Sequence, residues 1–573
     1  MRILQLRALL VSLACGLGSA TAAHAQWSRD PAAAAPIVRA PGPQYALVSA
    51  SDGLGGAWFA FEDRASDPLT HVRIQHLDYR GYALFGDSGK VCCTLASRQL
   101  APGIASDGAG GAFLTWVDFR ADTAGDLYAQ RFERTGAPAW NSAGVPLCAV
   151  PRMHVRGTTL AAGDSLDAYV LWQDDRAGGF IQDIYAQRVR RDGAMLWGAA
   201  DGIPVAPVHV YQVYQRVVAT DHGAVMLWAD SRLPALMKVY AQRFDRQGHP
   251  AWTTNGVELC PYPSTQFQPV ADVHPDGSFV AAWLDLRSNN GWAQVMAQRF
   301  DPAGAALGPD GGLPVSGAAH PAHTIALTPT ASGGTIATWS YGDGGHLHVL
   351  GQRFDAALAA QWPANGLLLL DVLDGMSVES WAVADAHDDG LSLAAATGSY
   401  GAYDIIGEQY GADGVPRWPS GVVIRQGGSE IYRAQVQIVK SYADIIVAWG
   451  DNRGFGDWDA DANLVNQAGV LAVPPPAPAA GAFFAAAAPS PVRSGAALAL
   501  RFTLPRAGAV EVTLLDVAGR ALRRARYAAP AGASVFTLAA RDERGAALAP
   551  GVILVRASSA GVTAATRRVV VLR

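Results

Sequence analysis

Two groups of polar side chains in this sequence have donor atoms suited to binding a ligand or a metal. The first lies where a long internal repeat loses its usual residues, and it comprises Tyr341, Asp343, His346, His348, Tyr400 and Tyr403. Loops on a rigid scaffold are where binding residues concentrate, so these positions predict a ligand site. The alternative is neutral drift in a degenerate repeat.

The second group offers oxygen ligands at alternate positions, as calcium loops do: Asp457, Asp459, Asp461 and Asn463. The spacing is not that of an EF-hand, because counting from Asp459 puts Leu464 where Gly is required and Val470 where Glu is required. Calcium is therefore a hypothesis here, and a solvated acidic turn is the alternative. Otherwise no cofactor is expected.

A third polar pattern recurs in most repeat units and is predicted to be structural. In this pattern an Asp follows the repeat Trp by two residues, and an Arg follows the Asp by two more. The Arg residues are Arg120, Arg176, Arg232, Arg287 and Arg453. An Arg cluster could bind carboxylates, but a residue present in nearly every unit serves what every unit shares. We expect charge-assisted bonds that hold the loop after each strand.

Motifs for nucleophilic or zinc-dependent catalysis are not evident. The sequence has no convincing Gly-x-Ser-x-Gly, HExxH or Cys with a partner His, so no catalytic residue is predicted. Four cysteines follow the N-terminal segment: Cys92, Cys93, Cys148 and Cys260. Cys93–Cys148 pairing, a vicinal Cys92–Cys93 bridge and buried free thiols remain open alternatives.

These groups sit on a repeat of about 55 residues, which three series of residues mark. The first series is a Trp at the end of an apolar run: Trp116, Trp172, Trp228, Trp283, Trp339 and Trp449, with Phe61 before it and Ala395 in the one gap. The second is Gln75, Gln130, Gln187, Gln242, Gln298, Gln352 and Gln409. The third is a later aromatic: Phe85, Trp140, Trp197, Trp252, Trp362 and Trp418, with Leu307 replacing it once. A fixed period of this length indicates a repeat architecture.

Each unit reads as four β-strands. The apolar run 111–116 and the alternating run 126–132 have strand length, and Asp107-Gly108 is a hairpin turn signal. Four-stranded units of this length are typical of β-propeller blades. We predict an all-β protein with eight blades over residues 26–473, seven blades being the alternative. Residues 36–41 resemble a fourth-strand segment and are predicted to complete the last blade and close the ring.

The C-terminal part resembles the immunoglobulin-like modules of the FlgD-like and type IX secretion (Por) sorting families. The Pro/Ala-rich segment 474–489 is predicted to be a linker. The resemblance then rests on Pro489-Ser490-Pro491, residues 500–505, residues 512–520, Pro550-Gly551 and the terminal residues 567–573. It implies an Ig-like β-sandwich over 490–573 that acts as a sorting signal recognised by secretion machinery. A purely structural appendage is the alternative.

Export is predicted from the first 25 residues. Arg2 and Arg7 precede the apolar run 8–17, and small residues end at Ala25, which is the pattern of a secretory signal peptide. Cys15 leaves a lipoprotein signal as an alternative, although Ser12 stands where an aliphatic residue is expected. No later segment has the length and apolar character of a transmembrane helix.

Composition narrows the partners. The 573 residues carry a net charge of −5, which argues against nucleic acid as a partner, because phosphate binding needs a basic surface. The sequence therefore predicts a secreted or cell-surface, non-catalytic propeller that binds an extracellular glycan or protein. A propeller glycosidase or lyase and a structural surface component are the alternatives.

Overall fold

The computed structural model describes residues 27–572 except 65–68, 151–155, 164–166, 177, 179–180, 199–200, 221, 234, 275, 289, 318, 374–380, 386–388, 400–401, 419–420, 429–435, 442–443, 453–457, 472–483, 489–491, 496, 505–507, 517–519, 530–531 and 560–561. The predicted signal peptide, Tyr400, Arg453 and Asp457 lie outside the described residues. The chain divides into two compact units, one ending at Val473 and the other beginning at Pro474.

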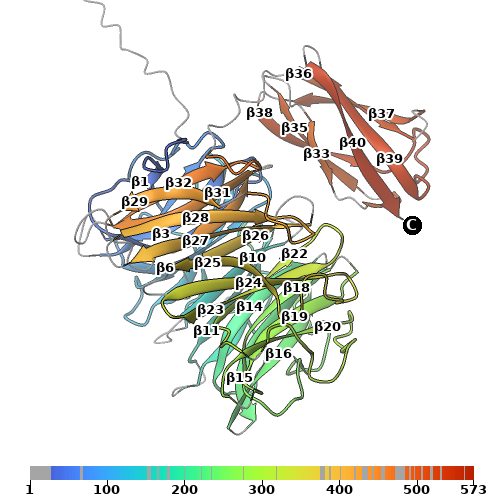
Figure 1. The fold of residues 1–573 in the computed structure, drawn as a ribbon. Helices are drawn as coiled ribbons and strands as arrows, with labels where there is room; N and C mark the ends of the chain where they lie inside the picture. Colours follow the sequence, from blue (N-terminus) through green and yellow to red (C-terminus); the bar gives the residue numbers. More distant parts are fainter. Residues whose placement is uncertain are drawn as a thin grey trace, which may run out of the picture. The chain divides into compact units, whose positions relative to one another are not determined.

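The first unit is an eight-bladed β-propeller (Figure 1). It consists of eight four-stranded antiparallel sheets, as the repeat predicted, and its described residues form strands without helices. The described residues contain no apolar helix of membrane-spanning length. From the innermost to the outermost strand, the blades are β2(Gln44–Ser51), β3(Ala57–Asp63), β4(His71–Leu77), β5(Lys90–Val91); β6(Gln99–Ser106), β7(Ala112–Asp118), β8(Asp126–Phe132), β9(Val145–Cys148); β10(Arg156–Ala162), β11(Ala168–Asp174), β12(Asp183–Val189), β13(Ile203–Pro204); β14(Gln212–Thr220), β15(Gly223–Leu233), β16(Leu236–Asp245), β17(Val257–Glu258); β18(Gln266–Val273), β19(Phe279–Asp285), β20(Gln294–Phe300), β21(Leu313–Pro314); β22(Thr324–Pro329), β23(Thr335–Asp343), β24(His346–Phe354), β25(Leu367–Leu373); β26(Trp381–Asp385), β27(Leu391–Ser399), β28(Ala402–Tyr410), β29(Val422–Gly428); and β30(Gln437–Ser441), β31(Asp444–Asn452), β32(Trp458–Val465), β1(Ala35–Val38).

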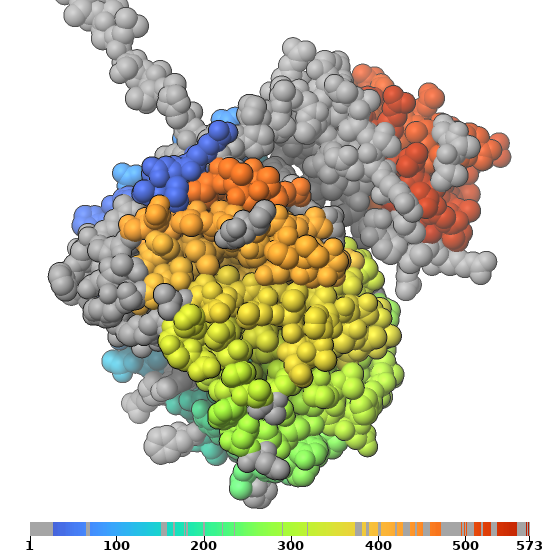
Figure 2. Space-filling model, viewed as in Figure 1, coloured from blue at the N-terminus to red at the C-terminus, as the bar shows by residue number. Residues whose placement is uncertain are grey.

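The first strand of each blade lies next to the first strand of the following blade, and β30 lies next to β2, so the ring is closed. The N-terminal strand β1 pairs with β32 and completes the eighth blade, which confirms the predicted closure. In Figure 1 the blue β1 lies beside the orange β32, and in Figure 2 blue and orange residues adjoin in the same way.

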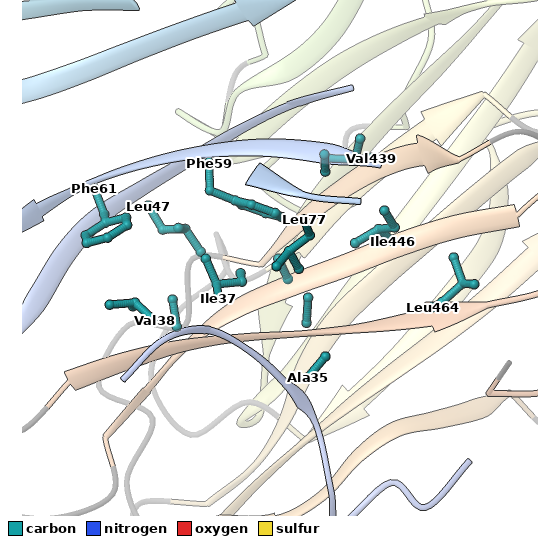
Figure 3. Packing of buried hydrophobic residues seen from close by; sticks show 14 of the residues in the cluster. Ala35, Ile37, Val38, Leu47, Phe59, Phe61, Leu77, Val439, Ile446 and Leu464 are labelled. Carbon is teal, nitrogen blue, oxygen red and sulfur yellow. The ribbon is translucent and has the colours of Figure 1, made fainter. Parts of the chain in front are cut away.

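Ring closure is reinforced by an apolar cluster at the seam between the first and eighth blades (Figure 3). Ile37 of β1, Phe59 of β3 and Ile446 of β31 are buried there, each with 0% of its surface exposed. Pairing β1 with β32 also removes an open sheet edge, which is where uncontrolled strand addition begins.

Each blade is built by the same local rules. In the second blade the Asp107-Gly108 turn joins the first two strands, and Gly108 has φ +68°, a conformation that glycine adopts at no steric cost. The second strand is buried on both faces, as in β7, because neighbouring blades cover both sides of each sheet. The Trp near the end of this strand packs on a glycine just ahead of the fourth strand. A Cβ at Gly144 would lie 2.5 Å from the Trp116 ring.

The second unit contains two sheets around one apolar core. The sheets are β33(Phe484–Ala488), β35(Ala497–Leu504), β38(Gly532–Ala539) and β34(Val492–Arg493), β40(Val562–Leu572), β39(Gly551–Ser559), β36(Gly508–Leu515), β37(Ala521–Ala529), in spatial order. Leu500 of the first sheet and Val512 and Val555 of the second belong to the same buried cluster. Two sheets that share a core form a β-sandwich. The Ig-like assignment of this sandwich stays a prediction.

Candidate functional site

The repeated Asp and Arg residues form an interaction that we call the Trp–Asp–Arg lock. In the second blade Trp116 Nε1 donates to Asp118 Oδ2 at 2.9 Å, and Arg120 Nη2 donates to the same oxygen at 2.5 Å. The Arg120 guanidinium also lies 3.8 Å from the centre of the Tyr128 ring. Asp118 is fully buried, and its pKa is lowered by hydrogen bonds from Arg120, Trp116 and Ser97, which outweigh the opposing effect of burial.

The same lock recurs in the third, fourth and fifth blades. The Trp-to-Asp distances there are 3.0, 2.8 and 3.2 Å, and the members are Trp172, Asp174 and Arg176; Trp228, Asp230 and Arg232; and Trp283, Asp285 and Arg287. These side chains bond to one another, so the structure supports the structural interpretation of this pattern. In the eighth blade the buried Trp449 holds the equivalent place.

In three of the locks the Arg side chain also contacts a cysteine sulfur of the preceding blade. The Arg Nη2 atoms of Arg120, Arg176 and Arg287 lie 3.4, 3.2 and 3.2 Å from the sulfurs of Cys93, Cys148 and Cys260, respectively. All four cysteines described are free and buried, so neither disulfide alternative is realised. Cys93 and Cys148 belong to the apolar clusters of different seams, whereas Cys92 and Cys93 share one cluster without a bridge. Burial raises the pKa of the Cys148 thiol to about 11.

The Gln series is structural as well. Gln130 Oε1 accepts from the backbone N–H of Arg131 and of Trp140, and Gln130 Nε2 donates to the Asn141 carbonyl. In the seventh blade, however, it is Glu408 that accepts from the N–H groups of Gln409 and Trp418. The assignment of Gln409 to this series is therefore wrong by one residue. Glu408 pairs across the sheet with Leu393, two residues before Ala395.

The described members of the calcium hypothesis lie on a strand rather than in a loop. Asp459, Asp461 and Asn463 alternate along β32 and are buried, so the alternative of a solvated turn is wrong for them. Arg39 of the N-terminal segment forms an ion pair with Asp461, and Asn463 Nδ2 donates to the Ile424 carbonyl at 2.8 Å. Among the described residues, no group of three His, Cys, Asp or Glu side chains is arranged to hold a metal.

The sixth blade departs from the lock. Tyr341 stands two residues after Trp339, in the place of the lock Asp, and the exposed Asp343 stands in the place of the Arg. His348 lies directly opposite Tyr341 in the sheet, as Asp126 lies opposite Asp118. Trp339 packs with residues of the fifth blade, and Tyr341 shares its strand face, so these residues lie at the seam between blades five and six.

Four rings form a continuous stack at this seam, which we call the ring stack. His320 lies on Tyr341 with ring centres 4.3 Å apart, Tyr341 on His348 at 4.5 Å, and His348 near His346 at 5.9 Å. The interplanar angles are 11°, 22° and 14°. Burial, followed by the charges of Asp343 and Asp371, raises the pKa of Tyr341, so its hydroxyl stays protonated and available as a donor.

A carboxylate completes the group. His346 Nδ1 lies 2.8 Å from Asp371 Oδ1, and His348 Nδ1 lies 3.6 Å from the same oxygen. The side chains of His346 and Asp371 keep 41% and 46% of their surface exposed. A carboxylate beside an imidazole fixes the ring orientation, so this pair can bind polar groups or move a proton.

Three residues of this region escaped the sequence prediction: His320, Asp371 and the exposed Trp292, whose neighbour Ala293 accepts a bond from Ala322. A signal for His320 existed. Ser97 and Ser264 bond the lock Asp from 21 residues upstream, and His320 is 21 residues upstream of Tyr341.

Tyr403 does not join the ring stack. It is buried on β28 among Ala394, Ile405 and Trp449, at the seam between blades seven and eight. The structure therefore brings Tyr341, His346 and His348 together, with Asp343 at the end of the same hairpin, and separates Tyr403 from them.

The fold defines this protein as an eight-bladed β-propeller with a variant seam that exposes polar rings. No family model and no curated protein matches the chain. It is similar in structure to an α-L-arabinanase of Penicillium chrysogenum complexed with arabinobiose (12% identity, TM-score 0.36, 65% of this chain and 95% of that one). It is also similar to a PL25 ulvan lyase bound to -[GlcA(1-4)Rha3S]- (10%, 0.39, 70% and 97%) and to a Dyadobacter fermentans protein of unknown function (9%, 0.34, 75% and 96%). At such identities the likeness concerns the fold alone.

Proposed function

We propose that this protein is an exported, non-catalytic β-propeller that binds an extracellular glycan at the seam between blades five and six. The observation that carries the proposal is the ring stack, which replaces the Trp–Asp–Arg lock with Tyr and His side chains. In blades two to five the polar groups of the lock bond to one another. In blade six the side chains of His346 and Asp371 are instead partly exposed, so their donors and acceptors are open to solvent. The exposed Trp292 adds an aromatic surface on the blade-five side of the seam, next to Ala293, whose carbonyl accepts from Ala322.

The experiment is a glycan array probed with the secreted chain, followed by titration of any glycan that binds. We expect Tyr341→Ala and His346→Ala to weaken binding at least tenfold, because each removes a donor and part of the stack. His249→Ala is the matched control, since His249 forms a comparable exposed pair with Asp245, 3.1 Å away, on a turn at the opposite end of its blade. Equal affinity of all three variants would contradict the proposal, as would an array without binding.

Cleavage of the bound glycan is the second candidate function, and the His346–Asp371 pair is the observation that favours it. Hydrolysis and β-elimination both need a group that donates or removes a proton, and a His oriented by a carboxylate does this near neutral pH. The test is incubation with each glycan that binds, measuring new reducing ends for a hydrolase and unsaturated uronides for a lyase. His346→Ala should abolish product while leaving part of the binding. No product at high protein concentration would leave binding alone.

Export and sorting belong to the same proposal. We infer secretion by the N-terminal signal and delivery to the exterior or cell surface through the C-terminal unit. The test compares the location of the full chain with that of a chain ending at residue 489. Periplasmic retention of the shorter chain is expected. Equal delivery of both chains would make the C-terminal unit a structural appendage.

A further inference from the structure

The central channel of the propeller is surrounded by the eight innermost strands. On each of these strands, one residue pairs with the position just before the repeat Trp, and these residues form one ring around the axis. They are Val48, Gly103, Thr159, Arg216, Val270, Ala326, Ala382 and Gln437. Arg216 is the charged member of this ring of eight.

Arg216 differs from the lock arginines in what it contacts. Its one hydrogen bond donates from Nη1 to the Gln215 carbonyl at 3.0 Å, and among the described residues no carboxylate pairs with it. Its side chain is nevertheless exposed, although the strand that carries it is the innermost of its blade. Only the channel can provide that exposure in the middle of such a strand.

The environment of this guanidinium is poor in compensating charge. Burial lowers the pKa of Arg216, and no acidic group within the described part of the chain opposes this effect. The pKa values of Arg120 and Arg176 are instead raised, because the carboxylates of Asp118 and Asp174 outweigh the effect of burial. The guanidinium is thus accessible from the channel although the surrounding chain crowds it, and an anion bound there would supply a counterion.

Tyr214 lies on the same strand, closer to the end of the channel where the lock loops gather. It is 40% exposed, and its ring centre lies 6.2 Å from that of Phe267 on the neighbouring innermost strand. A cation and an exposed aromatic ring on the same innermost strand suit a ligand that carries both an anionic group and an apolar ring face.

We propose that the central channel is an oxyanion site, in which Arg216 binds the carboxylate or sulfate group of an anionic sugar that packs on Tyr214. A guanidinium matches both groups because it can donate two parallel N–H bonds to two oxygens. This site is distinct from the ring stack, so it stands or fails independently of the glycan site proposed there.

The test is calorimetric titration of the full secreted chain with glucuronate, glucose 6-sulfate and glucose. We expect the two anions to bind and glucose to bind at least tenfold more weakly. Arg216→Gln should reduce anion affinity at least tenfold, and Arg216→Lys should reduce it less, because charge is kept while the paired donors are lost. Arg190→Gln is the control, since Arg190 forms an exposed ion pair with Asp192 and should leave affinity unchanged.

Thermal unfolding separates binding from a structural role. Arg216→Gln removes an unpaired, crowded charge and should leave the melting temperature unchanged or raise it, whereas loss of a lock arginine should lower it. Binding of one anion and not the other would identify the source of the oxyanion. The proposal is overturned if neither anion binds, or if Arg216→Gln binds both as well as the original chain. Loss of ring-stack binding in Tyr341→Ala with anion binding intact would show that the sites are separate.

Discussion

Breaking a single Trp–Asp–Arg lock is expected to destabilise the whole propeller. In Asp174→Ala, the Trp172 N–H loses its acceptor at 3.0 Å and the Arg176 guanidinium loses its carboxylate. Asp174 is fully buried and the Arg176 side chain is 18% exposed, so the remaining charge is poorly solvated. Removing one partner of a buried ion pair costs about 3–5 kcal/mol.

The expected change in melting temperature follows from the size of the ring. An unfolding entropy of about 2.1 cal/mol/K per residue over about 450 residues gives roughly 0.9 kcal/mol/K, so a loss of ~4 kcal/mol lowers the melting temperature by roughly 4 °C. The assay is calorimetry of the full chain, in which the propeller transition is followed separately from that of the C-terminal unit.

The matched control is Asp343→Asn. Asp343 is exposed and stands in the lock position of a blade without a lock, so its change should stay within about 0.5 kcal/mol. Arg176→Met combined with Asp174→Ala should cost less than the sum of the single changes, because no unpaired charge remains. If Asp174→Ala melts within 1 °C of Asp343→Asn, the locks do not hold the blades and this reasoning is refuted.

Three further predictions concern burial. Burial, followed by the charges of Asp122 and Asp118, raises the pKa of Asp126 to about 6. The folded state therefore binds more protons than the unfolded state, and its stability falls as pH rises from about 4 to about 6. Asp126→Asn should add roughly 1–2 kcal/mol to the free energy of unfolding at pH 7, after allowance for solvent screening, and nothing at pH 4, as measured by urea unfolding. The thiol of Cys148, with its pKa near 11, should be about 0.1% thiolate at pH 8 and react with iodoacetamide only after unfolding, followed by mass spectrometry. Ile37→Ala should cost about 2–4 kcal/mol and promote aggregation detected by light scattering, whereas the exposed Val470→Ala should do neither.

Much of the propeller could be predicted because its markers repeat for a physical reason. In blades two to five the Trp, Asp and Gln of each unit bond to partners in the same blade, so the period in the sequence records the period of the ring. The exception is instructive. Glu408 and Gln409 are adjacent, and residue type favoured Gln409, but only strand pairing decides which of the two accepts from the Trp418 N–H.

The candidate site was predicted only in part, because its residues come from three separate parts of the chain. Tyr341, His346 and His348 lie on one hairpin and stood out as departures from the repeat. His320 precedes the blade, and its only signal is that it stands 21 residues before Tyr341. Asp371 lies on the last strand of the blade and has no such signal. The burial of Asp459, Asp461 and Asn463 was not predicted, because alternation of oxygen-bearing residues also arises when one face of a strand meets a neighbouring blade.

The two proposed sites differ in the sign of their charge, which determines how one acidic glycan would bind to both. The ring stack carries the carboxylates of Asp343 and Asp371, which repel an oxyanion, whereas the channel ring carries Arg216 and no carboxylate among its eight residues. A polysaccharide with both neutral and acidic residues would therefore place its neutral residues at the seam and its acidic residue in the channel. Added salt should then weaken binding through Arg216 and leave the contribution of the ring stack nearly unchanged, because ions screen a charge pair and not a stacked ring.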